Sequence, residues 1–209
     1  RHHQQQKHDS ADNQVADIAN RSHGDDQQNR HAPQAGVSGI SVLTDTKYFG
    51  GSLDDLMQVR SIAGIPVLRK EFIIDAYQIH ESKAYGADVV LLIAAILSPG
   101  QIADLSQLAK ELKLEVLLEI HNEVELSKSD LSFVDLVGVN NRNLKTFTLD
   151  LETSRQLAKL IPDQKVKVSE SGISETETIR ELKKYGYQGF LMGENFMKTE
   201  FPGKTAALF

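Results

Sequence analysis

Two charged residues stand at places where an apolar run leads us to expect burial. Lys70 comes shortly after the run Ile65–Leu68, and Glu119 stands between the run Leu114–Leu118 and Ile120. A lysine at the end of a buried strand is partly desolvated, which suits it to proton donation, and a carboxylate inside an apolar strand is costly unless it is paired or functional. The pattern favours acid–base chemistry, with a surface lysine and a structural ion pair as the alternatives.

Further polar groups follow later apolar runs. Asn140 and Arg142 stand in Gly138–Asn143, which offers amide and guanidinium donors. Glu170 follows the run Val166–Val168 after one serine. Asn-rich segments are also typical of turns, so the amides are weak evidence by themselves. The recurrence of polar groups after successive runs predicts one site built from several strand ends.

Two glycine-containing segments indicate a phosphorylated ligand. Ser171 and Gly172 follow Glu170, and Gly193 lies one unit later in Leu191–Asn195. Barrel enzymes commonly bind phosphate with the loops after strands seven and eight, through backbone N–H groups and a helix N-terminus. A single glycine would simply make a turn, whereas glycines in consecutive units favour phosphate binding.

Seven short apolar runs must position these groups. Between them lie segments with apolar residues at three- and four-residue intervals, the amphipathic helix signature, and this alternation predicts a parallel sheet. The predicted strands are Gly39–Leu43, Ile65–Leu68, Asp88–Ile93, Leu114–Leu118, Leu136–Val139, Val166–Val168 and Gly189–Met192. The predicted helices are Ser52–Ile62, Asp75–Tyr85, Pro99–Leu112, Leu151–Leu160 and Glu175–Tyr185.

Single residues mark where some predicted helices begin and end. Pro99 suits a first-turn position, and Gly86 and Gly186 suit helix ends. Ser174 and Glu177 have the spacing of a capping box.

The predicted strands are apolar on both faces, as in a sheet that helices cover on each side. An open doubly wound sheet would give similar runs. A closed barrel gathers the carboxyl ends of all its strands onto one rim, and the polar residues fall at those ends. We therefore predict an α/β fold, a (β/α)8 TIM barrel.

The composition limits the classes of function. The chain has 209 residues and a formal net charge of −6, which gives no support to nucleic-acid or anionic-membrane binding through bulk charge. It contains no cysteine, hence no disulfide framework and no thiolate metal site. No apolar run reaches the ~18 residues of a membrane span. We expect a cytoplasmic protein, a monomer or weak homo-oligomer, that binds a small phosphorylated substrate and neither nucleic acid nor membrane.

Residues 1–36 differ from the rest of the chain. They contain five of the seven histidines and no aromatic residue, and they cannot bury enough apolar surface to order themselves. We expect a polar, poorly ordered arm over residues 1–36 and a β/α-barrel catalytic domain over residues 37–209.

The motifs resemble those of indole-3-glycerol phosphate synthase, an enzyme of tryptophan biosynthesis. The resemblance implies a (β/α)8 barrel and a carbon–carbon lyase that closes the indole ring of 1-(2-carboxyphenylamino)-1-deoxyribulose 5-phosphate. Carbon dioxide and water are released, and no cofactor or metal takes part. The resemblance runs from about Ala35 to Phe209 through Ser41–Asp45, Tyr48–Ser52, Leu68–Ile73, Leu118–Glu119, Gly138–Leu144 and Ser169–Ile173.

The resemblance also implies a role for each matching residue. Lys70 matches the general acid that protonates the ribulose carbonyl oxygen, and Glu119 matches the acidic residue of proton transfer during dehydration. Asn140 and Glu170 match polar residues that position the anthranilate and the ribulose hydroxyls. The implied substrate-binding residues are Arg142 as a supporting charge, Phe49 and Phe72 in an aromatic pocket, and Ser171, Gly172 and Gly193 in the phosphate loops.

The sequence departs from the family pattern in two places. The family's first strand has the form Glu-Xaa-Lys-Xaa-Xaa-Ser-Pro-Ser and supplies a second essential lysine, and we recognise no counterpart here. Seven strands do not close a standard eight-stranded barrel, so we expect an incomplete barrel unless another segment fills the gap. Glu194 stands in the second phosphate loop, where a small residue is often found.

Two other functions are compatible with the sequence. Another phosphosugar barrel enzyme, an isomerase or epimerase, would share the phosphate loops without needing Lys70, Glu119 and Asn140 together. A catalytically impaired barrel fragment would bind phosphate ligands only.

Overall fold

A computed structural model describes residues 36–200 and 205–206. Within these residues, seven strands form one sheet in the order β1-β2-β3-β4-β5-β6-β7. The strands are β1 (Ile40–Leu43), β2 (Val67–Lys70), β3 (Val89–Ile93), β4 (Glu115–Ile120), β5 (Leu136–Asn140), β6 (Val166–Glu170) and β7 (Tyr187–Leu191). The helices are α2 (Leu53–Ile62), α3 (Ala76–Ala84), α4 (Pro99–Glu111), α5 (Glu123–Ser127), α6 (Glu152–Leu157), α7 (Thr176–Lys183) and α8 (Glu194–Met197).

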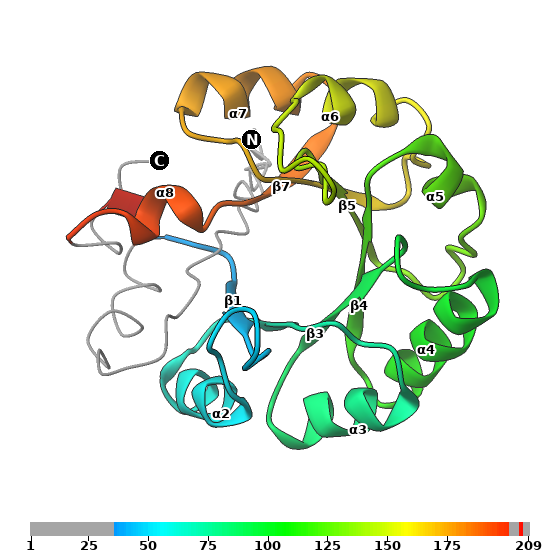
Figure 1. The fold of residues 1–209 in the computed structure, drawn as a ribbon, viewed down its shortest axis with the longest axis vertical. Helices are drawn as coiled ribbons and strands as arrows, with labels where there is room; N and C mark the ends of the chain where they lie inside the picture. Colours follow the sequence, from blue (N-terminus) through cyan, green and yellow to red (C-terminus); the bar gives the residue numbers. More distant parts are fainter. Residues whose placement is uncertain (1–35, 201–204, 207–209) are drawn as a thin grey trace, which may run out of the picture.

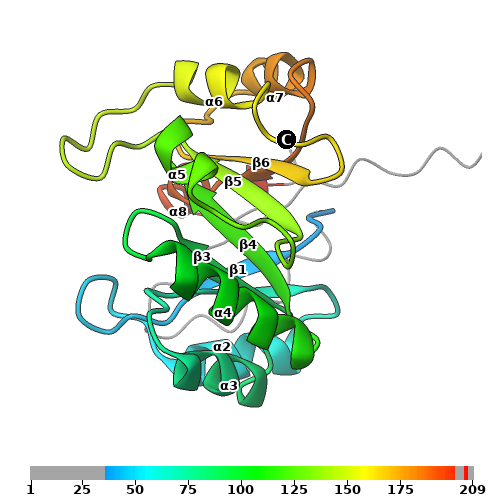
Figure 2. The same cartoon turned by 90° about the vertical axis from the view of Figure 1, so that its right-hand side faces the viewer.

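The sheet curls round a central axis and the helices lie on its outside (Figure 1). Figure 2 shows these outer helices at opposite sides of the barrel, with α2, α3 and α4 below the strands and α6 and α7 above them. Every neighbouring pair of strands is parallel. The predicted β/α-barrel architecture is confirmed. Among the described residues β1 and β7 are the edges of a seven-stranded sheet, so this part of the barrel is incomplete, as the sequence predicted.

Side chains alternate between two apolar layers along each strand, because successive residues of a strand point to opposite faces. In β3, Val90 and Leu92 pack against the helices, whereas Leu91 and Ile93 face the inside of the barrel. The inner layer consists of Leu68, Leu91, Ile93, Leu117, Val168 and Leu191. Residues two positions after the inner ones, at the carboxyl ends of the strands, therefore also face inward.

All seven predicted strands are present, with shifted ends. Four polar residues were predicted to follow the apolar runs, yet the structure includes them in β2, β4, β5 and β6: Lys70, Glu119, Asn140 and Glu170. Backbone pairing continues past the apolar run: Leu43 aligns with Lys70, and Asn140 aligns with Glu170. Hydrophobicity marks burial, whereas strand length is set by this pairing.

The helix signals were correct in part. Pro99 lies in the first turn of α4, after the N-cap Ser98, as predicted. Gly86 and Gly186 follow α3 and α7 with φ of 91° and 90°, a left-handed backbone that glycine adopts readily. The capping box at Ser174 is wrong, because the N-cap of α7 is Glu175 and makes no side-chain cap hydrogen bond.

Two helices were not predicted, and both are short. Helix α5 has five residues and α8 has four, too few to show a helical repeat of apolar positions. Helix α5 nevertheless has a sequence signal, since the side chain of Asn122 accepts a hydrogen bond from the backbone N–H of Glu125.

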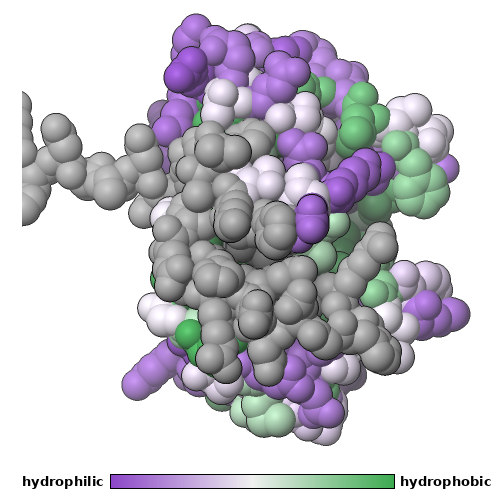
Figure 3. All heavy atoms as spheres, turned by 90° about the vertical axis from the view of Figure 1, so that its left-hand side faces the viewer, coloured by the Kyte–Doolittle hydropathy of each residue, from purple (hydrophilic) through white to green (hydrophobic). Residues whose placement is uncertain are grey.

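The predicted N-terminal arm, except for Gly36, lies outside the described residues. No helix in the described part of the chain is long and apolar enough to span a membrane. Figure 3 shows one side of the molecule, where hydrophilic side chains make up much of the coloured surface, with smaller hydrophobic areas between them.

Candidate active site

An ion pair joins opposite parts of the sheet at the mouth of the barrel. The Nζ atom of Lys70, at the end of β2, lies 3.4 Å from Oε2 of Glu170, at the end of β6. The Lys70 side chain is 23% exposed, whereas that of Glu170 is 2% exposed. The lysine thus presents a cation to the mouth while its carboxylate partner lies beneath the surface.

A second polar pair lies on the neighbouring strands. Asn140 of β5 donates from Nδ2 to Oε1 of Glu119 on β4, at 3.2 Å. Glu119 is buried, and Asn140 is partly buried. Because Asn140 aligns with Glu170 in the parallel ladder, this pair lies beside the Lys70–Glu170 pair. The structure therefore brings together the four residues that the sequence predicted as catalytic.

A histidine that the sequence analysis did not single out contacts the second pair. Nε2 of His121 lies 3.3 Å from Oε1 of Glu119, and Nδ1 lies 3.1 Å from Oε2 of Glu125. Burial lowers the pKa of His121, but the hydrogen bond to Glu125 and the charges of the nearby glutamates outweigh it and leave the pKa raised. The available signal was a polar residue directly after a buried strand, the same signal that identified Lys70.

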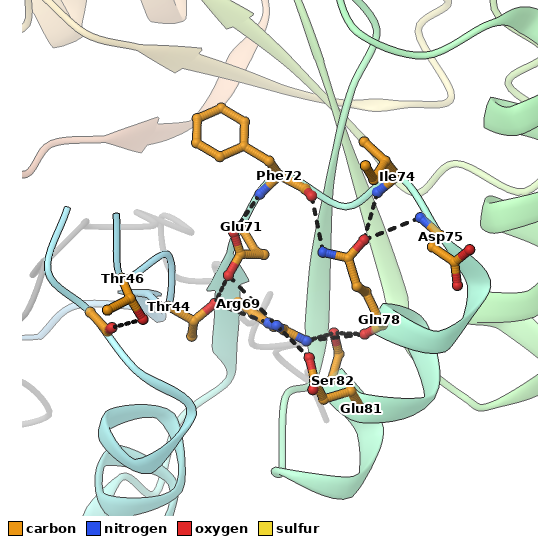
Figure 4. A network of polar contacts seen from close by, with 11 residues as sticks. Thr44, Thr46, Arg69, Glu71, Phe72, Ile74, Asp75, Gln78, Glu81 and Ser82 are labelled. Atoms are coloured by element: carbon orange, nitrogen blue, oxygen red, sulfur yellow. Dashed lines mark hydrogen bonds and ion pairs between the residues drawn. The ribbon is translucent and has the colours of Figure 1, made fainter. Parts of the chain in front are cut away.

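The position of Lys70 depends on its buried neighbour Arg69, which points away from the mouth toward the helices (Figure 4). The guanidinium donates to Oγ1 of Thr44 at 3.0 Å and to Oε2 of Glu81 at 2.7 Å. It also donates to Oγ of Ser82 at 3.0 Å. Successive side chains of β2 therefore have different roles. Arg69 connects the strand to α3 and to Thr44 after β1, whereas Lys70 faces the candidate site.

The loop after β2 is held by the same network. Thr44 donates to Oε2 of Glu71 at 2.6 Å, and Oε1 of Glu71 accepts from the backbone N–H of Phe72 at 2.9 Å. The side chain of Gln78 then donates to the carbonyl oxygen of Phe72 at 3.0 Å. Figure 4 shows these contacts in sequence from β1 to α3.

Aromatic side chains gather in the loops after β1 and β2. Phe49 stacks on Phe72 with ring centroids 6.2 Å apart, and Tyr48 meets Phe72 edge-on at 6.0 Å. All three rings are exposed. The structure therefore brings the predicted pair Phe49 and Phe72 together at the carboxyl end of the barrel, where they offer a surface for an aromatic ring.

The predicted phosphate loops follow β6 and β7. Ser171 and Gly172 both have a left-handed backbone, with φ of 66° and 75°. Gly193 is the N-cap residue of α8, and Asn195 donates from Nδ2 to the carbonyl oxygen of Ser174 at 3.1 Å. The two loops are thus tied to each other.

Buried Asn141 supports the first of these loops. Its Nδ2 donates to the carbonyl oxygens of Glu170 and Ser171 at 3.0 and 3.1 Å. Its Oδ1 accepts from Oγ of Ser154 on α6 at 2.8 Å. The sequence suggested that the two adjacent asparagines act as one group of donors. In the structure Asn140 contacts Glu119 of the candidate site, whereas Asn141 supports the backbone of the loop after β6.

Arg142 has an anionic partner. Its Nη2 lies 2.7 Å from Oε2 of Glu194, whose other oxygen lies 2.7 Å from Nζ of Lys198. The contacts of Lys198 and Arg142 hold the pKa of Glu194 below its ordinary value. The guanidinium predicted to support the substrate is therefore paired with the unusual acidic residue of the second phosphate loop.

A cavity of about 350 Å³ lies inside the barrel at the other end of the strands. Its lining includes Ser38 and Pro66, which precede β1 and β2, and the inner residues Leu68, Leu117 and Val168. This apolar layer separates the cavity from the polar pairs at the carboxyl ends, so the cavity is distinct from the candidate site. Within residues 36–200 and 205–206, no three His, Asp or Glu side chains are arranged as metal ligands.

The family model and the similar proteins that match this chain carry the same name. A family model described as indole-3-glycerol phosphate synthase matches residues 17–207. A protein of that name from Bacteroides thetaiotaomicron is 51% identical over 175 residues, which are 84% of this chain and 67% of that protein. One from Delftia acidovorans is 45% identical over 168 residues, which are 80% of this chain and 63% of that protein. The chain therefore spans about two thirds of the length of these relatives.

A solved structure supports the architecture. The N-acetylmannosamine-6-phosphate 2-epimerase from Clostridium perfringens is similar with a TM-score of 0.67, covering 93% of each chain. Its sequence identity is 13%, so the likeness shows the fold alone.

Proposed function

Because this chain belongs to the indole-3-glycerol phosphate synthase family, we propose that it converts 1-(2-carboxyphenylamino)-1-deoxyribulose 5-phosphate into indole-3-glycerol phosphate. The reaction forms a carbon–carbon bond between the anthranilate ring and the ribulose carbonyl carbon. Carbon dioxide leaves from the ring, and the former carbonyl oxygen leaves as water.

Lys70 is the general acid of the first step. As the ring carbon attacks, the carbonyl oxygen gains negative charge, and the ammonium group donates a proton to it. The placement of Lys70 at the mouth supports this role, because its side chain is partly exposed. The Glu170 carboxylate, 3.4 Å from Nζ, favours the protonated form of the lysine. A positioned cation also stabilises the developing oxyanion in a partly desolvated site.

Glu119 transfers protons in the dehydration step. Loss of carbon dioxide restores the aromatic ring. The new hydroxyl then leaves as water while the methylene carbon between the nitrogen and the reacted carbonyl carbon loses a proton. A buried carboxylate whose Oε1 accepts a hydrogen bond from Asn140 supports this role, since that bond helps to orient the carboxylate. Asn140 and Glu170 position the anthranilate and the ribulose hydroxyls.

The loops around the mouth bind the two ends of the substrate. The exposed cluster of Phe49 and Phe72 contacts the anthranilate ring. Ser171, Gly172 and Gly193 contact the phosphate through loops joined by the Asn195–Ser174 hydrogen bond. Arg142 supplies a supporting positive charge, which Glu194 partly neutralises.

One observation carries the proposal: Lys70, Glu119, Asn140 and Glu170 form two adjacent polar pairs on the inner face at the carboxyl ends of the strands. These are the residues that match the family's reacting groups. A barrel enzyme that isomerises or epimerises a simple phosphosugar does not need this combination.

The test is indole-3-glycerol phosphate formation by the full chain, followed by ultraviolet absorbance. We expect turnover by the unaltered chain and a loss of about 10²- to 10⁴-fold in Lys70→Ala and in Glu119→Gln. Lys159→Ala is the control, because Lys159 is exposed and follows α6 at the far end of the barrel. Turnover of a pentose phosphate without indole formation would favour an isomerase or epimerase. Phosphate binding without any turnover would contradict an enzymatic function.

A further inference from the structure

His121 lies between two carboxylates that belong to different elements. Its ring lies 3.3 Å from Glu119 through Nε2 and 3.1 Å from Glu125 of α5 through Nδ1, and its side chain is 10% exposed. The backbone N–H of His121 also donates to Oε2 of Glu125 at 2.8 Å. The ring is therefore held in one orientation, with one nitrogen toward the candidate site and the other toward the framework.

The charges around His121 favour its protonated form. The facing groups are Glu119 on β4, Glu125 on α5 and Glu170 on β6, and Lys70 of β2 pairs with the last of these. Burial opposes ionisation, but the hydrogen bond to Glu125 and the three negative charges outweigh it, so the pKa of His121 is raised above 6.5.

The protonation state of His121 decides how many of the two carboxylates can face an N–H group of the ring. The imidazolium carries an N–H on both nitrogens. Nδ1 then donates to Glu125, and Nε2, which makes no hydrogen bond within the described residues, becomes a cationic N–H 3.3 Å from Oε1 of Glu119. The neutral ring has one N–H, and donation to Glu125 then turns the Nε2 lone pair toward Oε1 of Glu119 at 3.3 Å. Two lone pairs at that distance repel each other, so the carboxylate of Glu119 must turn away.

We propose that His121 is a positioning residue for Glu119: as an imidazolium bridging Glu119 and Glu125 it holds the Glu119 carboxylate in its reactive direction, and it releases that hold on deprotonation. The inference rests on the proposed function, in which Glu119 transfers protons. It predicts that turnover falls as pH rises through the pKa of His121.

Two amide variants separate the two contacts. The amide nitrogen of Asn takes the place of Nδ1, so His121→Asn keeps the donor toward Glu125 and loses the one toward Glu119. The amide nitrogen of Gln takes the place of Nε2, so His121→Gln keeps the donor toward Glu119. A merely structural role would favour Asn, because the contact with α5 would then be the important one.

We expect kcat of His121→Gln to stay within about threefold of the unaltered chain, and kcat of His121→Asn to fall about tenfold or more with little change in KM. The fall in kcat as pH rises above about 6.5 should also be absent from His121→Gln, since an amide does not titrate in this range. Equal kcat in the two variants, or an unchanged pH profile in His121→Gln, would overturn the inference.

A titration independent of turnover completes the test. The ring resonance of His121 is identified by its loss in His121→Asn and followed by NMR from about pH 5 to about pH 9. We expect its pKa to fall in both Glu119→Gln and Glu125→Gln. A pKa unchanged by Glu119→Gln would overturn the bridge itself. Absence of indole formation by the unaltered chain, with this titration as expected, would contradict the proposed function and leave the bridge in place.

Discussion

Residue scale: Glu170 occupies space that only glycine can leave open on the neighbouring strand. A Cβ atom at Gly138 would overlap Oε1 of Glu170 and would come within 3.2 Å of the Leu117 side chain. Gly138→Ala should therefore displace the buried carboxylate from Lys70. We expect a loss of kcat/KM of about 10²-fold from a misplacement of about 1 Å, with destabilisation of only about 1–3 kcal/mol.

The matched control for this substitution is Gly100→Ala. Gly100 lies in the first turn of α4, and a Cβ there meets no atom within 4 Å. Activity should be unchanged in this control. Activity of Gly138→Ala equal to that of Gly100→Ala, measured in the same indole assay, would show that Glu170 does not need its present position.

His121 gives the free energy of unfolding a defined pH dependence. Its pKa is raised in the folded state, so its stabilising contribution is fully present below the unfolded value near 6.5. The contribution is lost as pH rises through the raised folded value. Urea unfolding at about pH 5.5 and about pH 9 should therefore show a larger loss of stability in the unaltered chain than in His121→Gln. An equal loss in both proteins would contradict the raised pKa.

The sequence predicted which residues form the site more readily than it predicted their partners. Lys70 and Glu119 stand out because charge interrupts an apolar run, a local signal. The pairing of Lys70 with Glu170, 100 positions later in the chain, depends on how the sheet curls and has no local signal. His121 escaped notice because its role depends on Glu125 in a helix too short to show periodicity.

Element scale: β2 is fixed by a buried cation rather than by apolar packing alone. Arg69 has a side chain 3% exposed and pairs with Glu81 at 2.7 Å and with Glu71 at 3.6 Å. Arg69→Met would leave both carboxylates without this cation in a largely dry environment. We expect a loss of about 3–5 kcal/mol in the free energy of unfolding, measured with urea.

An exposed ion pair gives the control for Arg69. Arg180 and Glu177 of α7 pair at 3.2 Å with side chains 73% and 74% exposed. Arg180→Met should change stability by less than about 1 kcal/mol, because solvent screens such pairs. Equal effects of the two substitutions would show that the network around Arg69 is not what holds β2.

Elements were predictable where their signal is periodic or apolar. Each strand followed from an apolar run, but β2 and β6 extend past it because backbone pairing continues to Lys70 and Glu170. Helix α7 begins at Thr176 with Glu175 as its N-cap, rather than with the predicted cap Ser174, whose carbonyl oxygen accepts a hydrogen bond from Asn195 of α8. That tertiary contact is invisible in the local sequence.

Whole-molecule scale: the two phosphate loops come from consecutive units and meet only in the folded barrel. A phosphorylated ligand that contacts both should therefore stabilise the whole fold. At a free ligand concentration about 100 times Kd, the gain is about 2.7 kcal/mol, which raises Tm by several degrees. Indole-3-glycerol phosphate should produce this rise and indole-3-glycerol should not, as measured by thermal unfolding. Equal shifts with both compounds would contradict the assignment of the loops.

The barrel itself was predictable because all seven units repeat the same alternation, and each repetition points to the same parallel sheet. The repetition does not specify whether the curled sheet closes into a complete barrel. Seven strands lie among the described residues, with β1 and β7 as edges, and the sequence shows no counterpart of the family's first strand.

The most direct test of the account follows the carboxyl carbon of the substrate. The full chain is incubated with 1-(2-carboxyphenylamino)-1-deoxyribulose 5-phosphate labelled at the ring carboxyl group, and labelled carbon dioxide and indole-3-glycerol phosphate are measured together. We expect one carbon dioxide released for each indole formed, with both lost in Lys70→Ala. Substrate that is bound or isomerised while its label stays on the ring would contradict the assignment of Lys70 and Glu119 to ring closure.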